Sequence, residues 1–464
     1  MSLFSIMDRP KSRPATQQPA HGTASLLQQF PAEVTYIVFD HLEREDLISF
    51  RLASNVCARF GAPALFRSLH VMFTLKSFQN IMEISRKEEL SKQVREISYE
   101  PVFLPRISKE VYKARFRSFE RQLDDHTLRV DNDIFRTETE KAAKVAWKAY
   151  QTIRDEQIYI RIANIDVITF ANATRQFPLL ETITISNNCG CPQKFSLPTQ
   201  LAYKASRAVD HLHLISHVFG EDVGVRGANA ILASLPPSGR IKDIQIVEVD
   251  WSFIVLPPPK TPNIYLPFFS RLTTIRLSFA PSRRELANRP GLPSPTLRHK
   301  EFAKLLKSAT NLENLHLKVM KSQISKGHAL ECLAKYIPVY LHTIFEDCTW
   351  PKLHTLEICG ITADERTLNS LLQRHASTLK SLRLCGIHLL SEELGAYRNI
   401  LDCIQSHMNV TSLDLGGLWL VSMTVSSYPR AYNFDNGWTR TLCTAFENKE
   451  KVPYEDLKTE EVVS

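Results

Sequence analysis

The sequence predicts an α/β protein in which an all-α unit of three short helices precedes an irregular solenoid of strand–turn–helix units that carries a helical insertion. Three observations predict it: a proline-led apolar segment at 30–71, a recurring aliphatic word, and helical spacing between its copies. We expect a disordered arm (1–24), the three-helix unit (25–70), a first weak repeat with the helical insertion (71–178), the solenoid (179–446) and a flexible tail (447–464).

The composition is that of an ordinary globular protein. Of 464 residues, 44% are hydrophobic and 23% charged, and no apolar run is long enough to span a membrane. The net charge of +8 does not indicate a nucleic-acid partner, because Lys and Arg are interleaved with acidic residues almost everywhere. Nine irregularly spaced cysteines favour reduced thiols over a disulfide framework, so we expect a cytoplasmic or nuclear protein.

The proline-led segment is predicted to form the three helices. Pro31 can begin the first because its missing N–H is one that a helix start leaves without a partner, and Asp46 can cap the second. A unit of about forty residues is too small to bury so much apolar surface, so a partner is expected. The first helix carries this surface on one face, at Val34, Ile37, Val38 and Leu42.

The solenoid is predicted from an L-x-x-L-x-L word, in which L is any large aliphatic residue. Its copies begin between 26 residues (Leu353 to Leu379) and 41 residues (Leu312 to Leu353) apart. Two weaker copies lie upstream, at Phe66/Leu69/Val71 and Val94/Ile97/Tyr99. The eight stronger copies are Leu180/Ile183/Ile185, Val209/Leu212/Leu214, Ile241/Ile244/Ile246, Leu272/Ile275/Leu277, Leu312/Leu315/Leu317, Leu353/Leu356/Ile358, Leu379/Leu382/Leu384 and Val410/Leu413/Leu415.

Helices are predicted between the words. Thr362 and Glu365 have the spacing of a capping box, and the residues after them repeat at helical spacing. A unit of one strand and one helix cannot bury its apolar face alone, so several must stack into a curved solenoid. From Leu180 to Val421 the chain resembles the leucine-rich repeat family. That family has Asn or Cys three residues after the word, whereas this chain has Asn188, His217, Val249, Ala280, Met320, Ile361, Ile387 and Leu418, so apolar stacking largely replaces the polar ladder.

Two kinds of segment interrupt the repeats. Between 107 and 157 the spacing predicts two amphipathic helices, the second with Val145 and Ala146 on its inner face. Proline-rich stretches at 255–267 and 280–296 are predicted to be loops inserted into repeats. The prolines from Pro257 to Pro259 leave open a second interpretation, a polyproline ligand for a partner domain.

The proline-led segment resembles an F-box. The order of residues carries the resemblance: Phe30-Pro31-x-Glu33, then Val34 and Ile37, Leu42-x₃-Asp46-Leu47, Arg51-Leu52-Ala53-Ser54, Phe60, and Ala64-Leu65-Phe66-Arg67. The resemblance implies docking on a Skp-family adaptor, which links the chain to a cullin scaffold and a ubiquitin-conjugating enzyme. The alternative is a helical cap that closes the open end of the repeat array. The implied adaptor contacts are Leu27, Pro31, Val34, Ile37, Leu42 and Leu47.

A target protein is expected on the concave face of the solenoid. The aliphatic residues of each word point into the core, so the residue between the last two faces outward from the sheet. This row is polar and mixed in charge: Thr184, His213, Gln245, Arg276, His316, Glu357, Arg383 and Asp414.

Signatures of enzyme chemistry are missing from the sequence. It has no P-loop, nucleophile elbow, H-E-x-x-H motif or dinucleotide fingerprint, so we expect neither an enzyme nor a cofactor. A zinc site is one open alternative, because cysteines follow one word and histidines belong to the next. Its ligands would come from Cys189, Cys191, His211, His213 and His217.

Two functions fit these features. In the first, the chain is the substrate receptor of a Skp–cullin–F-box ubiquitin ligase, with the adaptor at one end and a protein target on the repeats. In the second, it is a non-catalytic interaction or scaffold protein that uses its F-box outside a ligase. The sequence does not identify the target or show whether phosphorylation is needed for its recognition.

Overall fold

The computed structural model describes most of the chain from 32 to 422. The described residues are 32–104 except 43 and 54, 107–113, 132–186, 225–250 except 237–238, 262–280, 295–319, 339–391 except 346, 396–422, 430–434 and 459–460. The arm predicted at 1–24 lies outside them, as do Leu27 and Pro31.

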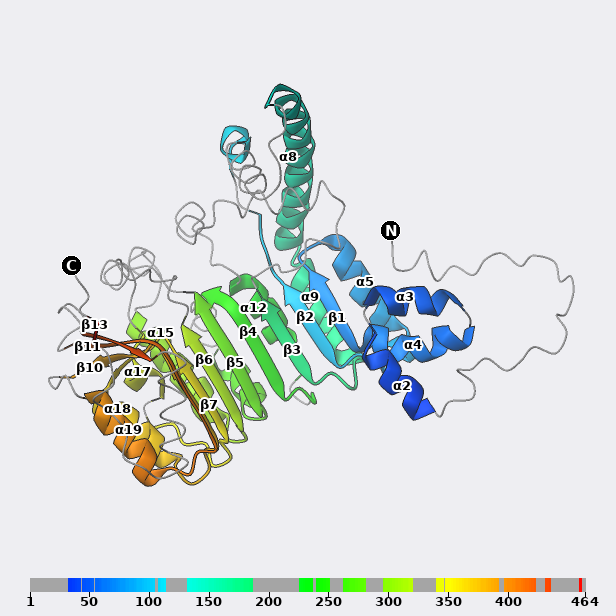
Figure 1. Ribbon diagram of the computed structural model, residues 1–464. Helices are drawn as coiled ribbons and strands as arrows, with labels where there is room; N and C mark the ends of the chain where they lie inside the picture. The colour runs from blue at the N-terminus through cyan, green and yellow to red at the C-terminus, as the bar shows by residue number, and fades with distance from the viewer. Residues whose placement is uncertain are drawn as a thin grey trace, which may run out of the picture.

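A parallel sheet runs through the repeat region (Figure 1). The order of these strands in the sheet is their order in the sequence, so each connection leads to a strand beside the one it left. The strands in order are β1 (Ser68–Met72), β2 (Glu96–Glu100), β3 (Thr182–Ser186), β4 (Asp243–Asp250), β5 (Thr274–Ala280), β6 (Asn314–Val319), β7 (Thr355–Cys359), β9 (Ser381–Cys385) and β11 (Ser412–Ser422).

The aliphatic words form these strands, as predicted. Their middle residues pair in register from strand to strand and are buried in one continuous core, except that Leu413 at the last strand is only partly buried. The two copies that looked weak also form strands, β1 and β2, so the sheet begins at residue 68. The registered residues are Leu69, Ile97, Ile183, Ile244, Ile275, Leu315, Leu356, Leu382 and Leu413.

One predicted repeat does not lie between its expected neighbours. The word from Val209 to Leu214 was expected to form a strand between β3 and β4, and its residues lie outside those described. Because β3 pairs directly with β4, no strand separates the two. The predicted position of this repeat is therefore wrong.

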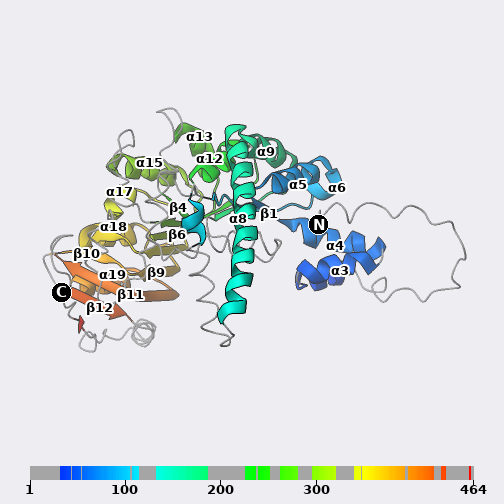
Figure 2. The same ribbon diagram turned by 90° about the horizontal axis from the view of Figure 1, so that it is seen from above.

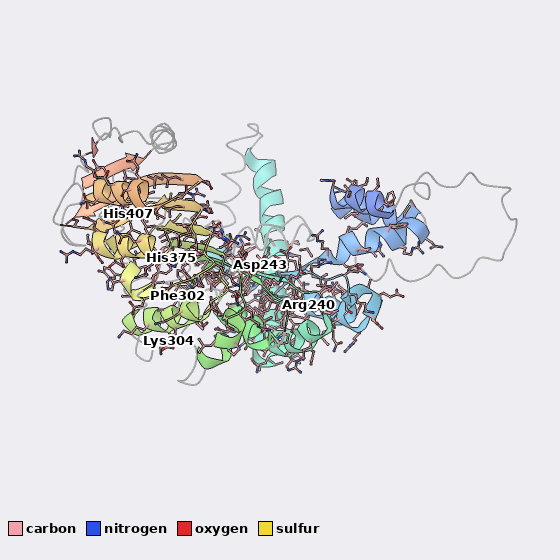
Figure 3. All side chains as sticks on the ribbon, turned by 90° about the horizontal axis from the view of Figure 1, so that it is seen from below. Arg240, Asp243, Phe302, Lys304, His375 and His407 are labelled. Carbon is pink, nitrogen blue, oxygen red and sulfur yellow. The ribbon has the colours of Figure 1, made fainter. Side chains whose placement is uncertain are left out.

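Helices cover one face of the sheet and leave the other open (Figure 2). Phe302 and His375 are buried between the layers (Figure 3), and the imidazole of His375 accepts a hydrogen bond from the backbone N–H of Trp350 at 3.0 Å. The covering helices are α5 (Leu75–Arg86), α6 (Glu88–Ser91), α9 (Ile165–Ala173), α12 (Val225–Ser234), α13 (Pro262–Phe269), α15 (Pro295–Ser308), α17 (Leu341–Phe345), α18 (Glu365–Arg374) and α19 (Ala396–His407).

The last repeats contain a second strand each, which the sequence did not predict. After β7 and β9 the chain turns at Gly360 and Gly386, with φ of 75° and 58°, into β8 (Thr362–Asp364) and β10 (His388–Leu390). These pair in parallel with each other, and β10 pairs with the end of β11. Thr362 thus belongs to a strand, and the cap of α18 is instead Asp364, whose carboxylate accepts the Thr367 N–H at 2.7 Å.

The position three residues after a word is apolar and buried in three of the described repeats. Val249, Ile361 and Ile387 occupy the position of Asn or Cys and are buried. Two antiparallel strands, β12 (Arg430–Phe434) and β13 (Thr459–Glu460), continue from β11. The second of these comes from the segment predicted to be a flexible tail.

The N-terminal unit consists of α2 (Ala32–Asp40), α3 (Arg44–Ala53) and α4 (Asn55–Arg67), with Pro63 inside α4. Four of its described buried side chains belong to the core of the repeats. Phe39, Leu47, Leu65 and Phe66 are buried in the same cluster as the repeat strands. Since α4 ends at Arg67 and β1 begins at the next residue, no linker separates the unit from the solenoid.

The helical insertion is anchored at its base. The long helix α8 (Asn132–Ile162) stands out from the sheet (Figure 1) and packs its inner side into a small separate cluster with Tyr112. Gln157 fixes it, donating to the carbonyl of Val102 and accepting from the N–H of Leu104. Ala146 is buried as predicted, but Val145 is exposed, because the packed stripe lies about one residue away from the predicted one. The first predicted helix lies mainly outside the described residues.

None of the helices described here is long and apolar enough to cross a bilayer.

Candidate functional site

The first candidate surface is an exposed apolar strip on α2. Val34, Ile37 and Val38 lie at i, i+3 and i+4, so they share one face of the helix, and they are 41%, 60% and 50% exposed. The opposite face carries Thr35 and Phe39, which are buried. Phe39 packs edge-to-face against Phe50 of α3, with ring centroids 4.9 Å apart. Burial of one face against α3 and α4 therefore leaves the other face to solvent.

The structure divides the six predicted adaptor contacts. Val34 and Ile37 lie on the exposed strip. Leu42 is half-buried against the main core, and Leu47 is 6% exposed and part of that core. Leu47 therefore stabilises the fold and does not belong to the exposed strip. Leu27 and Pro31 lie outside the described residues.

Sequence reasoning left two exposed apolar residues of this unit out of the contact set. Val38 was placed on the apolar face of the first helix, and its exposure assigns it to the strip. Leu52 of α3 is exposed as well. The helical spacing that identified Val34 and Ile37 was also the signal for Val38.

The second candidate surface is a row of polar residues on the open face of the sheet. These residues alternate with the buried aliphatics and pair in register across the strands, on the side that the helices leave uncovered (Figure 2). Seven of the eight predicted residues lie in register across the strands, and His213 lies outside the described residues. In order the row is His70, Ser98, Thr184, Gln245, Arg276, His316, Glu357, Arg383 and Asp414.

Charged side chains at the far end of the row contact one another. His316 Nδ1 lies 2.8 Å from Glu357 Oε2, Arg383 Nη1 lies 3.4 Å from Glu357 Oε1, and Arg383 Nε lies 3.0 Å from Asp414 Oδ2. The hydrogen bond from His316, with the positive charge of Arg383, lowers the pKa of Glu357 against the effect of its partial burial. Single surface pairs contribute little, but a chain of four holds its members in a common arrangement.

This arrangement offers a polar partner hydrogen-bond donors and acceptors and charges of both signs. Arg276 extends the row as an exposed cation. Among the residues described, no three His, Cys, Asp or Glu side chains gather as a metal site would require. The proposed zinc ligands Cys189, Cys191, His211, His213 and His217 lie outside those residues, so the zinc hypothesis stays a prediction.

The chain matches no protein-family model, and no curated protein matches it. The function is therefore argued from the two surfaces.

Proposed function

We propose that this protein is the substrate receptor of a Skp–cullin–F-box ubiquitin ligase, working in the cytoplasm or nucleus. The observation that carries the proposal is the exposed apolar strip of Val34, Ile37 and Val38, within the segment whose residue order resembles an F-box. The strip docks on the adaptor, the polar row binds a target protein, and the partners carry out the transfer of ubiquitin.

Exposure of the strip to water is unfavourable in free energy. Complete burial of an aliphatic side chain contributes about 1.5–3 kcal/mol, and these three are still about half exposed, so covering them contributes roughly 2–5 kcal/mol in total. This is less than a stable complex needs after the entropy of association is subtracted, so further contacts must come from residues such as Leu27 and Pro31.

The polar row suits a protein target because of its size and its placement. It crosses successive strands of the open face, away from the helices, and ends at the paired charges of Glu357, Arg383 and Asp414. Helix α2, which carries the strip, lies at the β1 end of the sheet (Figure 1). An adaptor and a target can therefore bind at the same time, which a receptor requires.

The test compares two exposed isoleucines. Ile37→Asp places a charge on the strip, and Ile162→Asp makes the same change on α8, where Ile162 is 77% exposed. Neither side chain is needed for packing, whereas Asp at the half-buried Leu42 would also perturb the core. We expect Ile37→Asp to lose adaptor co-purification from cells and Ile162→Asp to retain it. Retention by Ile37→Asp would refute the docking surface.

The same pair separates a ligase receptor from a scaffold. In a receptor, Ile37→Asp releases the adaptor but keeps the target, so a protein that co-purifies with both variants should lose ubiquitin and gain abundance only with Ile37→Asp. If adaptor binding is lost and no bound protein changes its ubiquitination or its abundance, the chain acts outside a ligase.

A further inference from the structure

Two cysteines lie side by side on the open face of the sheet. Cys359 ends β7 and Cys385 ends β9, and the two are register partners on neighbouring parallel strands. Each is two residues after a member of the polar row, Glu357 or Arg383, so both side chains project on that face. Among the described cysteines, these are the two that pair in register; Cys57, Cys348 and Cys403 are buried elsewhere.

The geometry permits a bond between the two sulfurs. Registered neighbours in a sheet are about 4.8 Å apart, within the window of about 4.4–6.8 Å between the Cα atoms of disulfides. The Cys359 thiol donates a hydrogen bond to Glu357 Oε1 at 3.6 Å, so a carboxylate faces the pair. Gly416 follows Cys385 in register on β11, and a Cβ at Gly416 would lie 3.2 Å from Cys385 Sγ, so glycine keeps that side clear.

The two thiols differ in exposure and in acidity. Cys385 is partly exposed, whereas Cys359 is 8% exposed. The adjacent Cys359 thiol, followed by the charge of Arg383, lowers the pKa of Cys385 to about 7, against partial burial and the charges of Asp414 and Glu357. The pKa of Cys359 is raised, first by the adjacent Cys385 and then by burial. The more exposed Cys385 is thus the attacking thiol, and the buried Cys359 is the resolving thiol.

We propose that Cys359 and Cys385 form a dithiol that reacts with low-molecular-weight disulfides such as glutathione disulfide and closes into an intrachain disulfide. The Cys385 thiolate attacks one sulfur of the disulfide, which forms a mixed disulfide and releases one thiolate. Cys359 then loses its proton and attacks Cys385 Sγ, which forms the Cys359–Cys385 bond and releases the second thiolate. Two protein thiols are oxidised, and one small disulfide is reduced to two thiols.

The second step follows from the first. While Cys385 is a thiolate, its negative charge disfavours a second thiolate at Cys359. Once Cys385 carries a glutathionyl group that charge is gone, and the Cys359 proton, which is donated to the Glu357 carboxylate, is lost more easily. The proposal does not depend on the function proposed above, because it concerns only groups within the chain.

The experiment treats the reduced full-length protein with glutathione disulfide at pH 7 and maps its cysteines by mass spectrometry. We expect a peptide pair linked through Cys359 and Cys385. Cys359→Ser should keep a glutathionyl group on Cys385. Cys385→Ser should remove the linked pair and lose glutathionylation at this site, because the remaining thiol, Cys359, is buried. Cys403→Ser, at a cysteine of α19, is the matched control and should react as the unaltered protein does.

The proposal is overturned if no peptide pair linked through Cys359 and Cys385 forms in the unaltered protein, and this outcome does not depend on whether the variants fold. So would a persistent glutathionyl group at Cys385 in that protein, or a glutathionyl group found mainly at other cysteines. Arg383→Gln adds an independent readout: the pH midpoint of alkylation at Cys385 should rise from about 7, and an unchanged midpoint would contradict the assigned role of the guanidinium.

Discussion

Ile37→Ala and Leu47→Ala should affect different properties, adaptor binding and fold stability, although the F-box resemblance implies the same role for both residues. Ile37 is 60% exposed on the strip, whereas Leu47 is 6% exposed in the core. Truncation of Ile37 removes apolar area that only a partner covers, and truncation of Leu47 opens a cavity inside the chain. The first change should weaken adaptor binding, and the second should weaken the fold.

The magnitudes follow from burial. If the adaptor covers the exposed 60% of Ile37, the side chain contributes about 1–2 kcal/mol, so the adaptor Kd should rise about 5- to 30-fold with no loss of stability. Leu47→Ala should destabilise its surroundings by about 2–5 kcal/mol, as large-to-small changes in cores do.

The assay measures both quantities on each variant. Calorimetry with the purified adaptor gives the Kd, and hydrogen exchange of the α2–α4 amides gives the local free energy of opening. We expect Ile37→Ala to change the Kd alone and Leu47→Ala to speed exchange. The reasoning is refuted if Ile37→Ala binds the adaptor as tightly as the unaltered chain, or if both variants lose binding and protection in parallel.

Three further changes test the fold and its charges. Gly360→Ala should lower the free energy of unfolding by more than about 2 kcal/mol in urea, because φ is 75° and a Cβ would clash with the backbone carbonyl oxygen of Val319 in β6. Glu357→Gln should reduce the loss of stability in acid, because the hydrogen bond from His316 lowers the pKa of Glu357 in the folded protein. The stabilisation that Glu357 supplies is complete above the ordinary carboxyl pKa of about 4.3 and is lost as the pH falls through the lower folded value. Urea midpoints measured from pH 3 to 6 would show the difference. Arg226→Met should cost about 3–5 kcal/mol by leaving the buried Asp166 carboxylate without its partner at 3.1 Å, and Asp166→Asn in the same chain should recover part of it.

The repeat layer could be predicted from sequence because its signal is local and recurs. Each word places aliphatic residues on one side of a short strand. In this parallel sheet, equivalent positions of successive words pair with each other. The register from Thr184 to Asp414 therefore follows from alignment of the words. The ion pairs between Glu357, Arg383 and Asp414 are a direct consequence of that register.

Other features depend on contacts that no local pattern encodes. The word at Val209 has the aliphatic spacing of a strand, yet β3 and β4 pair without it, because pairing depends on which strands meet. Thr362 and Glu365 have the spacing of a capping box, but a turn at Gly360 makes Thr362 part of a strand. The thiol pair likewise becomes visible only when Cys359 and Cys385 meet across strands 26 residues apart in sequence.

The two interpretations of the N-terminal unit, adaptor docking and capping of the array, describe opposite faces of the same helices. Phe39, Leu47 and Phe66 close the end of the repeat core, so removing the unit would expose that core. The strip of Val34, Ile37 and Val38 faces away from it and is left uncovered. Because α4 passes into β1 with no intervening residue, an adaptor held by the strip would take a fixed orientation relative to the polar row. In the proposed receptor this fixed orientation would favour transfer of ubiquitin to a bound target, because group transfer depends on how the reacting partners are oriented.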